Sequence, residues 1–493
     1  MSEIKKTASE TSGQGNLNRR SFIKTAGATA LAGFAAKRAH ASVYKSILPA
    51  SVLGANEKLY TGHIGIGGMG RSNLGFALQR DDIQPVAICD IYKKNLFRAS
   101  QMLKQKFPDF EQYKDFRDLL ENKDVDAVVI ATSDHWHCLC TLFAADAGKH
   151  IYCEKPLSTT IAEGHAMVDA VKRNGIVFQG GNMQRSGTHF QEAVELVKSG
   201  YIGDIAHVET WSHDQDNIQS IGMGDDDLAK YEGDDYGIDW DFHQGWVEHR
   251  PFNINRWIYN FRWFLEYSGG KITDWGAHLI DIVLWAMGEE KQPLSVTSQG
   301  GKYILQDNRT TPDTLEVAWR FEDYVLTFKN RVWNPQLLDG SYSDHGIVFY
   351  GTLGMLKVDR GGYEVKSFPA NGGCEAVKAG ASELNQPHWT NWLECIKSGG
   401  TPISNIDVLH NTTRVCHIGT CSYVAGAHFN SGATFQDGEL PDEAPAHGGT
   451  TLGWDDATQR FNQGDPEAVE IANAWAYREY KNGWSLKAPY RTA

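Results

Sequence analysis

Between residues 59 and 180, short apolar runs alternate with stretches of helical periodicity. The apolar runs are residues 60–64, 86–89, 126–131, 150–153 and 176–179. The helical patterns between them are residues 71–79, 93–106, 116–121, 138–147 and 161–174. This order of strand and helix predicts an α/β domain whose parallel sheet is covered on both faces. Ligands of such domains bind at the carboxyl ends of the strands.

From residue 181 onward the pattern changes. An amphipathic helix is predicted at residues 190–199. The segments that alternate as strands do are residues 206–211, 295–305, 315–321, 325–330, 346–350 and 355–358. They predict an α+β domain, residues 181–430, with a large and mainly antiparallel sheet. If the outer face of this sheet is apolar it needs a partner, which favours a homodimer or homotetramer.

The last part of the chain is expected to return to the first domain. Helical patterns at residues 388–398 and 408–423 are placed to brace it. Beyond residue 430 Gly, Asp and Pro become frequent, so residues 431–464 are predicted to be an irregular surface arm before a helix at 467–480. The chain is too long for one core, and we expect domains at 59–180 and 181–430 with a C-terminal extension at 431–493.

Residues 1–41 have the pattern of a signal peptide. Arg19 and Arg20 precede a weakly apolar run at 25–36 and an Ala-x-Ala site that ends at Ala41. The pattern predicts export to the periplasm by the twin-arginine machinery, cleavage near Ala41, a linker at 42–58 and no membrane anchor. The alternative is a buried or interfacial amphipathic helix.

Charge and cysteine content exclude several classes of partner. The chain carries 47 Lys and Arg against 61 Asp and Glu, a net charge of −14, which becomes about −19 without the predicted signal. Such an acidic surface argues against nucleic acid and anionic membranes as partners. The eight cysteines do not form a disulfide framework in a chain of this size, and Cys138 and Cys140 have no second pair at ligand spacing, so no zinc site is expected. The acidic run Asp225–Asp227 could bind a cation but matches no calcium-loop spacing, so we predict no metal.

A glycine-rich turn joins the first strand to the first helix. Its residues are Gly65, Ile66, Gly67, Gly68, Met69 and Gly70, which form a G-x-G-x-x-G pattern. Such a turn lets the backbone approach a pyrophosphate, which the helix N-terminus attracts. Asp90 ends the next strand, where a ribose 2′-hydroxyl needs an acceptor. We predict that Gly65, Gly67, Gly68, Met69, Gly70 and Asp90 bind NAD; Lys93 or Lys94 leaves NADP possible.

Two further loops follow strands of the same sheet and are expected to meet the glycine turn in one crevice. One is Thr132–His137 and the other is Glu154-Lys155-Pro156. A lysine at a strand end can place its ammonium beside a nicotinamide ring and a substrate hydroxyl; the simpler alternative is a solvated lysine in a turn. His137 can reach the nicotinamide ribose or the substrate, or cap the following helix.

In this combination the chain resembles the glucose-fructose oxidoreductase, inositol dehydrogenase and rhizopine-catabolism family (Gfo/Idh/MocA). The motifs are the glycine turn, Thr132-x-x-x-x-His137, Glu154-Lys155-Pro156 and Asp274-Trp275-Gly276-Ala277-His278. The resemblance is strongest to the exported twin-arginine branch, which often carries Asp-His-Trp-His, here residues 134–137, and a late His-Trp-x-Asn, here residues 388–391.

The resemblance implies hydride transfer between a sugar or polyol carbon and a nicotinamide cofactor. Lys155, Asp274 and His278 match the family's catalytic residues. Asp274, His278 and Asp281 are spaced to share one face of a helix. His278, oriented by Asp274, would take the hydroxyl proton, and Lys155 would hydrogen-bond the same oxygen. A helix cap and a structural histidine are the simpler alternatives for an isolated pair.

Further contacts are expected around these residues. Cofactor contacts are expected from Thr132, His137, Glu154, Lys155 and Arg185. Substrate contacts are expected from Arg185, Trp275, His278 and His243. The long polar and aromatic stretch between residues 214 and 267 contains His243, and it either stacks on sugars or forms a subunit contact.

Export has a consequence for the chemistry, because free nicotinamide cofactor is scarce outside the cytoplasm. We therefore expect a tightly bound cofactor that is recycled in the site. One alternative is a glycosidase that oxidises, eliminates and re-reduces its substrate, as in the exported α-N-acetylgalactosaminidases; that family lacks the Glu-Lys-Pro and Asp-Trp-Gly-Ala-His motifs present here. A second alternative is a sensor that binds nucleotide and sugar without turnover.

Overall fold

The computed structural model describes residues 58–213, 220–231, 237–335, 343–431 and 447–491, all within a single compact unit of the chain. The predicted signal peptide and nearly all of the predicted linker lie outside the described residues. Among the helices of the described part, none combines the length and the apolar character needed to cross a membrane.

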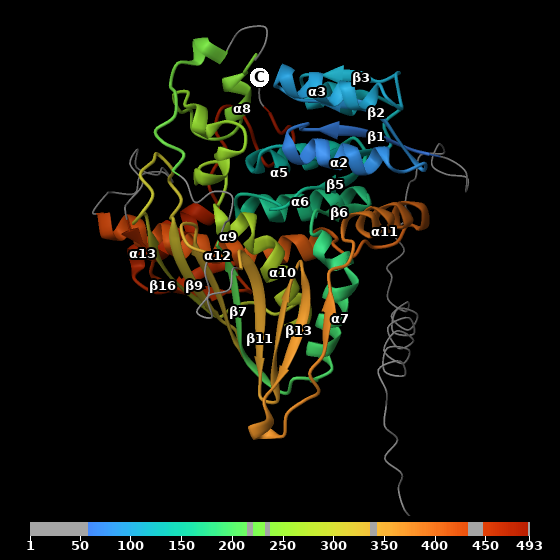
Figure 1. The fold of residues 1–493 in the computed structure, drawn as a ribbon. Helices are drawn as coiled ribbons and strands as arrows, with labels where there is room; N and C mark the ends of the chain where they lie inside the picture. The colour runs from blue at the N-terminus through green and yellow to red at the C-terminus, as the bar shows by residue number, and fades with distance from the viewer. Residues whose placement is uncertain (1–57, 214–219, 232–236, 336–342, 432–446, 492–493) are drawn as a thin grey trace, which may run out of the picture. The chain divides into compact units, whose positions relative to one another are not determined.

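The first domain contains a six-stranded parallel sheet of order β3-β2-β1-β4-β5-β6 (Figure 1). Its strands are β1 (Leu59–Ile64), β2 (Ile83–Cys89), β3 (Glu111–Tyr113), β4 (Ala127–Ile130), β5 (His150–Cys153) and β6 (Phe178–Gly180). Its helices are α2 (Gly68–Leu78), α3 (Lys93–Leu103), α4 (Phe116–Glu121), α5 (Asp134–Asp146) and α6 (Ile161–Asn174). The predicted α/β domain is confirmed; only the short, polar β3 was not predicted.

The sequence defines where these helices begin and end. In α6, Thr160 accepts a hydrogen bond from the Glu163 backbone and Glu163 bonds back, which makes a capping box. Gly175 ends the same helix with φ of +62°, a conformation that glycine adopts without strain. All four residues of β4 and of β5 are buried, as expected for central strands of a parallel sheet.

The second domain is built on a mixed, mainly antiparallel sheet of order β14-β13-β12-β11-β7-β10-β9-β8-β16-β17, with β15 paired to β8; only β7 and β10 run parallel. Its strands are β7 (Ile205–Ser212), β8 (Ser295–Gly301), β9 (Thr314–Arg320), β10 (Val325–Arg331), β11 (His345–Gly351), β12 (Gly354–Asp359), β13 (Gly362–Ser367), β14 (Lys378–Gly380), β15 (His447–Gly448), β16 (Thr451–Asp455) and β17 (Arg460–Gln463). The predicted sheet is confirmed.

One face of this sheet packs on helices (Figure 1). The helices of the domain are α7 (Thr188–Lys198), α9 (Lys271–Asp274), α10 (Gly276–Met287), α11 (Asn385–Ser398), α12 (Ile406–Ser431) and α13 (Pro466–Ala476). On the other face Lys329 forms an ion pair of 2.8 Å with Glu209, and Thr327 lies opposite Glu209 in the register. The prediction of a homodimer or homotetramer assumed that this outer face is apolar, and these polar side chains do not fit that assumption. The oligomeric state stays a prediction.

The prediction of an irregular arm at residues 431–464 is wrong for its described part. β15, β16 and β17 extend the large sheet beyond β8, because Leu452, Trp454 and Phe461 supply apolar side chains that the sheet buries. Beyond α13 the chain crosses to the first domain. There the Tyr480 hydroxyl donates to Glu163 Oε1 (2.6 Å) and the Tyr490 hydroxyl donates to Asp146 Oδ2 (2.6 Å).

The late helices brace the first domain, as predicted. Trp389 of α11 stacks on Tyr152 of β5 with ring centroids 5.2 Å apart, and Trp392 contacts the same ring edge-on. α12 packs along α6. The two domains are thus held together by α11 and α12 of the second domain.

A segment from residue 220 to residue 267, which we call the insert, lies between β7 and α9. Its described residues form short helices: η3 (Leu228–Tyr231), α8 (Trp240–Gln244), η4 (Ile254–Arg256) and η5 (Asn260–Trp263). It packs on the first domain, where the Trp136 and Phe242 rings stack 5.1 Å apart. Lys114 of the first domain also forms a 2.6 Å ion pair with Asp239 of the insert.

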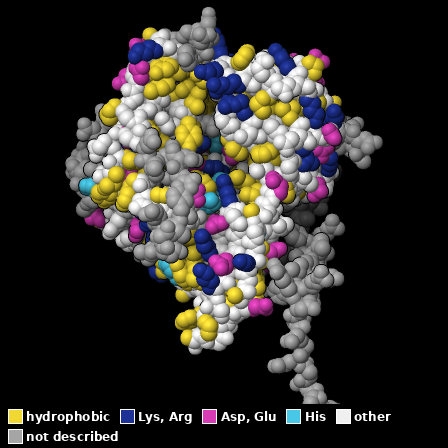
Figure 2. Space-filling view, in the orientation of Figure 1, with side chains coloured by type: hydrophobic (Ala, Val, Ile, Leu, Met, Phe, Trp, Pro, Cys, Tyr) yellow, Lys and Arg dark blue, Asp and Glu magenta, His cyan; other side chains and the backbone are white. Residues whose placement is uncertain are grey.

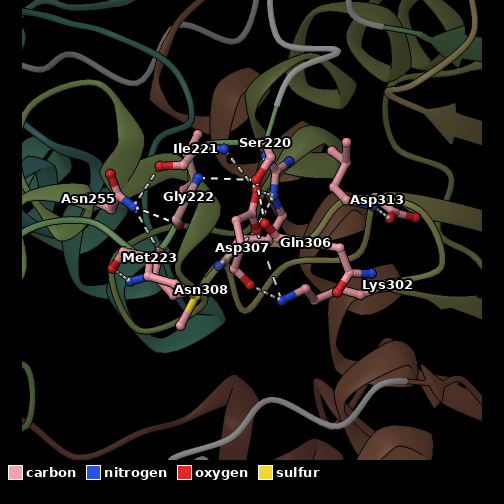
Figure 3. A network of polar contacts seen from close by, with 12 residues as sticks. Ser220, Ile221, Gly222, Met223, Asn255, Lys302, Gln306, Asp307, Asn308 and Asp313 are labelled. Carbon is pink, nitrogen blue, oxygen red and sulfur yellow. Dashed lines mark hydrogen bonds and ion pairs between the residues drawn. The ribbon is translucent and has the colours of Figure 1, made fainter.

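Polar contacts fasten the insert to the loop after β8 (Figure 3). Asp307 Oδ2 accepts from the Ile221 amide (3.0 Å), and Asn308 Nδ2 donates to the Met223 carbonyl (2.9 Å). Asn255 Nδ2 donates to the carbonyls of Ile221 and Gly222 (3.1 Å each). Since backbone groups are satisfied in this way, the insert keeps a defined shape without long helices or strands.

Candidate active site

A pocket of about 830 Å³ opens at the carboxyl ends of β1, β2, β4 and β5. Its walls on the first domain include the glycine turn, Asp90, residues 131–134, Trp136, His137, Glu154 and Lys155. The facing wall is the insert, with residues 254–255, residues 257–262, Phe242 and His243. In Figure 2 a hollow lies near the middle of the face, and Lys, Arg and His side chains gather around it. The three predicted loops therefore meet in one crevice.

The glycine turn leaves room for a ligand at two positions and is closely packed at two others. A Cβ on Gly68 would meet no atom within 4 Å, and one on Gly67 only the Asn95 amide at 3.9 Å. Gly65 has φ of +82°, and a Cβ on Gly70 would lie 1.9 Å from the Gly65 carbonyl. No side chain caps the N-terminus of α2. The open backbone and the uncapped helix end fit the pyrophosphate of a dinucleotide.

Asp90 lies in the pocket wall and fastens the turn. Its Oδ2 accepts from the Ile66 amide and its Oδ1 from the Tyr92 amide, both at 2.8 Å. Burial raises the pKa of Asp90 to about 6 against these hydrogen bonds. Lys94, Arg71 and Arg98 line the same end of the pocket, whereas Lys93 does not.

His137 and Thr132 both line the pocket. His137 Nδ1 lies 2.7 Å from the Pro156 carbonyl, so this nitrogen carries the proton. His137 Nε2 and Thr132 Oγ1 are buried without a hydrogen-bond partner of normal geometry among the described residues. Burial lowers the pKa of His137, so its neutral ring offers Nε2 as an acceptor. His137 lies within α5, so it is not a helix cap.

Glu154 lines the pocket next to Lys155 and is itself held in place. Its Oε1 accepts from Asn73 Nδ2 of α2 at 2.9 Å. Burial raises its pKa, and hydrogen bonding from Asn73 and the charge of Lys155 oppose that shift. Glu154 therefore ties the lysine loop to the helix that follows the glycine turn.

Lys155, which lines the pocket, contacts Asp274 of the second domain. Its Nζ lies 2.6 Å from Asp274 Oδ1 and 3.0 Å from the Asp274 carbonyl oxygen. Arg262 of the insert approaches the same carboxylate at 3.7 Å. Burial would raise the pKa of Asp274, but the charges of Lys155, Arg262 and Lys271 hold it well below its usual range. The carboxylate therefore stays ionised and fixes the ammonium.

His278 lies in the first turn of α10, and neither of its ring nitrogens has a hydrogen-bond partner among the described residues. Burial, together with the charges of Lys155 and Arg360, lowers its pKa well below the usual histidine value. The ring is therefore neutral at physiological pH and able to accept a proton. Trp275 lies against it, with ring centroids 5.9 Å apart.

The expected single helical face is wrong in part. The helix is interrupted at Trp275, between α9 and α10, and no hydrogen bond joins Asp274 to His278 among the described contacts. Asp274 instead orients Lys155. Asp281 lies away from the pocket, where its carboxylate accepts from Arg185 and from Thr412.

The predicted ligand contacts of Arg185 and His243 are wrong, because other residues of the protein already bind these two side chains. Arg185 was expected to lie over the crevice, but its guanidinium is buried between Asp281 (2.7 Å) and Glu289. His243 lies in the pocket wall, but its Nε2 is bonded to the Arg256 carbonyl (3.0 Å) and its ring packs against Trp257, 4.5 Å away. His243 thus belongs to the core of the insert and does not offer its ring to a sugar.

Several residues that the structure brings to the site lie outside every motif of the sequence. Gln184 Nε2 donates to the His278 carbonyl (3.1 Å), and Gln184 Oε1 accepts from Arg360 Nε (3.2 Å). Arg360 also lies over the Trp275 ring, 4.6 Å from its centroid. Arg262 lies in the short helix η5 and Arg360 in the turn between β12 and β13, both outside any motif. Gln184 is adjacent to Arg185, the residue predicted to contact the ligands.

In the described residues no group of three or more His, Cys, Asp or Glu side chains is placed to hold a metal ion. The acidic run at residues 225–227 binds Lys230, which lies 2.9 Å from Asp225. All eight cysteines are free, and seven of them are buried.

Curated proteins of similar sequence include a glycosyl hydrolase family 109 protein and an inositol 2-dehydrogenase. Over 212 residues the chain is 29% identical to a glycosyl hydrolase family 109 protein of Shewanella baltica, covering 39% of this chain and 45% of that protein. Over 147 residues it is 33% identical to an inositol 2-dehydrogenase of Salmonella typhimurium, covering 29% of this chain and 43% of that protein. The matched stretch thus spans less than half the length of these curated relatives.

Solved structures share the fold over most of the chain. A levoglucosan dehydrogenase in complex with NADH and levoglucosan has a TM-score of 0.55 at 18% identity, covering 73% of this chain and 96% of that one. An NADPH-dependent oxidoreductase candidate from Desulfitobacterium hafniense has a TM-score of 0.57 at 16% identity, covering 74% and 95%. At this identity the likeness shows the fold alone.

Two family models match consecutive parts of the chain. Residues 60–181 match the model described as an oxidoreductase family with an NAD-binding Rossmann fold, and residues 229–357 match the GFO/IDH/MocA C-terminal domain. Together they span half of the chain, in the order that the two domains have in the structure. The chain belongs to the Gfo/Idh/MocA family of oxidoreductases, with an NAD-binding Rossmann domain followed by the family's C-terminal domain.

Proposed function

We propose that this protein is an NAD(P)-dependent oxidoreductase that transfers a hydride between the carbinol carbon of a sugar or polyol and a tightly bound nicotinamide cofactor. The observation that carries the proposal is the pairing of Lys155 with Asp274 at 2.6 Å, with the neutral His278 close by. Lys155 also lines the pocket that begins at the glycine turn.

Different residues of the chain have different roles in the proposed hydride transfer. When bound, the nicotinamide supplies a hydride acceptor at its C4 atom. His278 takes the hydroxyl proton during oxidation and returns it during reduction, since its ring is neutral and unpaired. Lys155, held by Asp274, donates a hydrogen bond to the substrate oxygen as it becomes a carbonyl. Trp275 offers an aromatic face to the sugar.

NAD is the preferred cofactor in this proposal. The carboxylate of Asp90 favours a ribose hydroxyl over a 2′-phosphate. Arg71, Lys94 and Arg98 line the same end of the pocket and are the groups through which NADP would be accommodated. Thr132 Oγ1 and His137 Nε2 would bind the nicotinamide ribose or its neighbouring phosphate, since both lack partners.

We also propose that the protein is exported to the periplasm with its cofactor in place, and that it works as a homodimer or homotetramer. The twin arginines at residues 19 and 20 support export by the twin-arginine machinery. Because this machinery carries folded proteins, the cofactor can be bound before export. The insert supports retention of the cofactor, because it forms the second wall of the pocket. The oligomer rests on the family resemblance alone.

A second candidate is glycosidic cleavage through transient oxidation, elimination and re-reduction. The 29% identity to the family 109 glycosyl hydrolase favours it. The two activities differ in their products, since cleavage of an aryl glycoside releases the phenol without net reduction of the cofactor. A non-catalytic sensor would keep its biological function in a Lys155→Ala variant.

The first test is to purify the protein from periplasm, denature it in acid and identify the released nucleotide by absorbance and mass. We expect near-stoichiometric NAD(H) or NADP(H). Sugars, polyols and aryl glycosides are then added to the intact protein while the reduced-nicotinamide band is followed. Protein that carries no nucleotide and binds neither NAD nor NADP would contradict the proposal.

A further inference from the structure

A partly buried arginine lies beside the proposed catalytic residues, and no described residue forms an ion pair with it. Arg360 occupies the turn between β12 and β13 and lies over Trp275, 4.6 Å from the ring centroid. Gln184 joins it to the catalytic helix, since the amide accepts from Arg360 Nε (3.2 Å) and donates to the His278 carbonyl (3.1 Å). The guanidinium is therefore positioned by two groups that also contact His278.

The carboxylates around Arg360 are already engaged. Those that influence its charge are Asp274, Asp344 and Glu154. Asp274 binds Lys155, and Asp344 Oδ1 lies 2.8 Å from His345 Nδ1. Glu154 accepts from Asn73. Among the described residues, no carboxylate forms an ion pair with Arg360.

Two other arginines of the same domain show the usual arrangement. Arg185 lies 2.7 Å from Asp281, and Arg309 lies 2.8 Å from Asp307; both guanidiniums are buried. Burying a charge without a partner is costly, and the fold provides partners at these two positions. Within the described part of the chain, the guanidinium of Arg360 bonds only through Nε, to Gln184, and lies over Trp275. Its Nη groups have no carboxylate there, as expected where the partner is a ligand.

We propose that Arg360 binds the carboxylate of an acidic sugar, a uronic or aldonic acid, whose carbinol carbon then lies beside His278 and Lys155. A planar guanidinium whose Nε is already bonded presents its Nη groups to a carboxylate through charge-assisted hydrogen bonds. Trp275 lies under the guanidinium and holds its plane. This inference rests on the proposed function and adds the substrate class.

The test compares neutral and acidic forms of the same sugar on the cofactor-loaded protein. The pairs are glucose with glucuronate and gluconate, and galactose with galacturonate; glucose 6-phosphate provides a second kind of anion. Both kcat/KM and the dissociation constant from calorimetry are measured for wild type, Arg360→Gln and the matched surface control Arg320→Gln. Arg320 lies on β9 and is exposed.

We expect an acidic sugar to be preferred, and Arg360→Gln to lower kcat/KM for it by about 10- to 100-fold, mainly through KM. The same variant should lower kcat/KM for the neutral sugar much less than for the acidic sugar, because only the acidic sugar loses a charge-assisted hydrogen bond. Arg320→Gln should leave both unchanged. A neutral preference in wild type, or an equal loss for both sugars, overturns the inference; preference for the sugar phosphate overturns the carboxylate.

Calorimetry separates this inference from the proposed function. If acidic sugars bind in an Arg360-dependent way but no sugar reduces the cofactor, the oxidoreductase proposal fails and the binding role of Arg360 stands. If neutral sugars are oxidised and acidic sugars neither bind nor react, the function stands and the role of Arg360 fails.

Discussion

Lys155 Nζ lies 2.6 Å from Asp274 Oδ1, although the two residues are 119 positions apart in the chain. Lys155 follows the fifth strand of the Rossmann sheet, and Asp274 ends a short helix of the second domain. The pair therefore forms only when both domains are folded and docked. Both side chains are mostly buried, so their charges interact more strongly than they would in water.

Lys155→Ala should lower kcat by about 10²- to 10⁴-fold, because the substrate oxygen loses its charged donor. Bound nucleotide should be retained, since the glycine turn, Asp90 and His137 are unchanged. Steady-state rates and the nucleotide content after acid denaturation check both statements. Lys172→Ala, which removes a half-exposed ion pair with Asp407, is the control. Full turnover by Lys155→Ala would exclude the assigned role.

Asp274→Asn should destabilise the protein at neutral pH by about 3 kcal/mol, because Lys155 is left buried without its anion. The pKa of Asp274 lies below its usual range, so the carboxylate stabilises the fold above the unfolded-state pKa of about 4. That contribution is lost as the pH falls further. Denaturant unfolding between pH 3 and pH 7 should show the wild type losing its advantage over the variant in the acidic range.

A constant difference between the two proteins across that range would show that the loss is one of packing alone. Asp323→Asn is a suitable control, since Asp323 forms an exposed ion pair with Lys291 and such pairs contribute little to stability.

The sequence predicted those site residues that directly follow a recognisable strand of the parallel sheet. Gly65, Asp90, Thr132 and Lys155 follow the carboxyl ends of parallel strands, so the sheet topology places them together. The insert has no such period, and its contacts come from single side chains such as Asn255. Its packing over the pocket was therefore not predictable.

The wrong predictions for Arg185 and for residues 447–463 also concern segments without a regular pattern of apolar residues. Arg185 and Gln184 are adjacent, and only the register of one short helical turn decides that the glutamine contacts the His278 backbone and the arginine contacts Asp281. The strands at residues 447–463 were missed because turn residues dominate that segment. Their apolar side chains are few, and the sheet edge that receives them lies about 150 positions earlier in the chain.

Asp90→Asn should shift cofactor preference towards NADP by about 10-fold, because it removes the charge that repels a 2′-phosphate. The amide can still accept one hydrogen bond from the backbone of the turn. Dissociation constants of NADH and NADPH, from nicotinamide fluorescence, measure the shift. Adding Arg98→Ala should reduce the gain, since Arg98 lines the same end of the pocket; an unchanged preference in Asp90→Asn would place the discrimination elsewhere.

The pH dependence of sugar oxidation should show an acid limb well below the ordinary histidine pKa of about 6.5. Burial and the charges of Lys155 and Arg360 lower the pKa of His278, so the ring stays neutral and able to accept a proton as the pH falls through 6. Activity should decline only at lower pH. His278→Asn should reduce kcat by about 10²-fold or more and remove this limb.

A second variant, Arg360→Gln assayed with a neutral sugar, tests whether nearby positive charge lowers the pKa of His278. Removing one of the two positive charges should move the acid limb towards higher pH. A limb in the wild type at or above pH 6.5, or one that persists in His278→Asn, would assign the ionisation to another group.

Trp257 should control how long the cofactor stays bound. It lines the pocket from the insert, and its ring meets Tyr92 of the first domain edge-on, with centroids 5.9 Å apart. Trp257→Phe keeps an aromatic contact, whereas Trp257→Ala opens a gap where the two walls of the pocket meet. We expect cofactor release, followed by exchange against labelled NAD, to accelerate by about 10-fold or more in Trp257→Ala and less in Trp257→Phe. The exposed Trp333 gives the control variant Trp333→Ala; equal release rates in all four proteins would mean that the insert does not hold the cofactor, and the recycling of a resident cofactor would then need another cause.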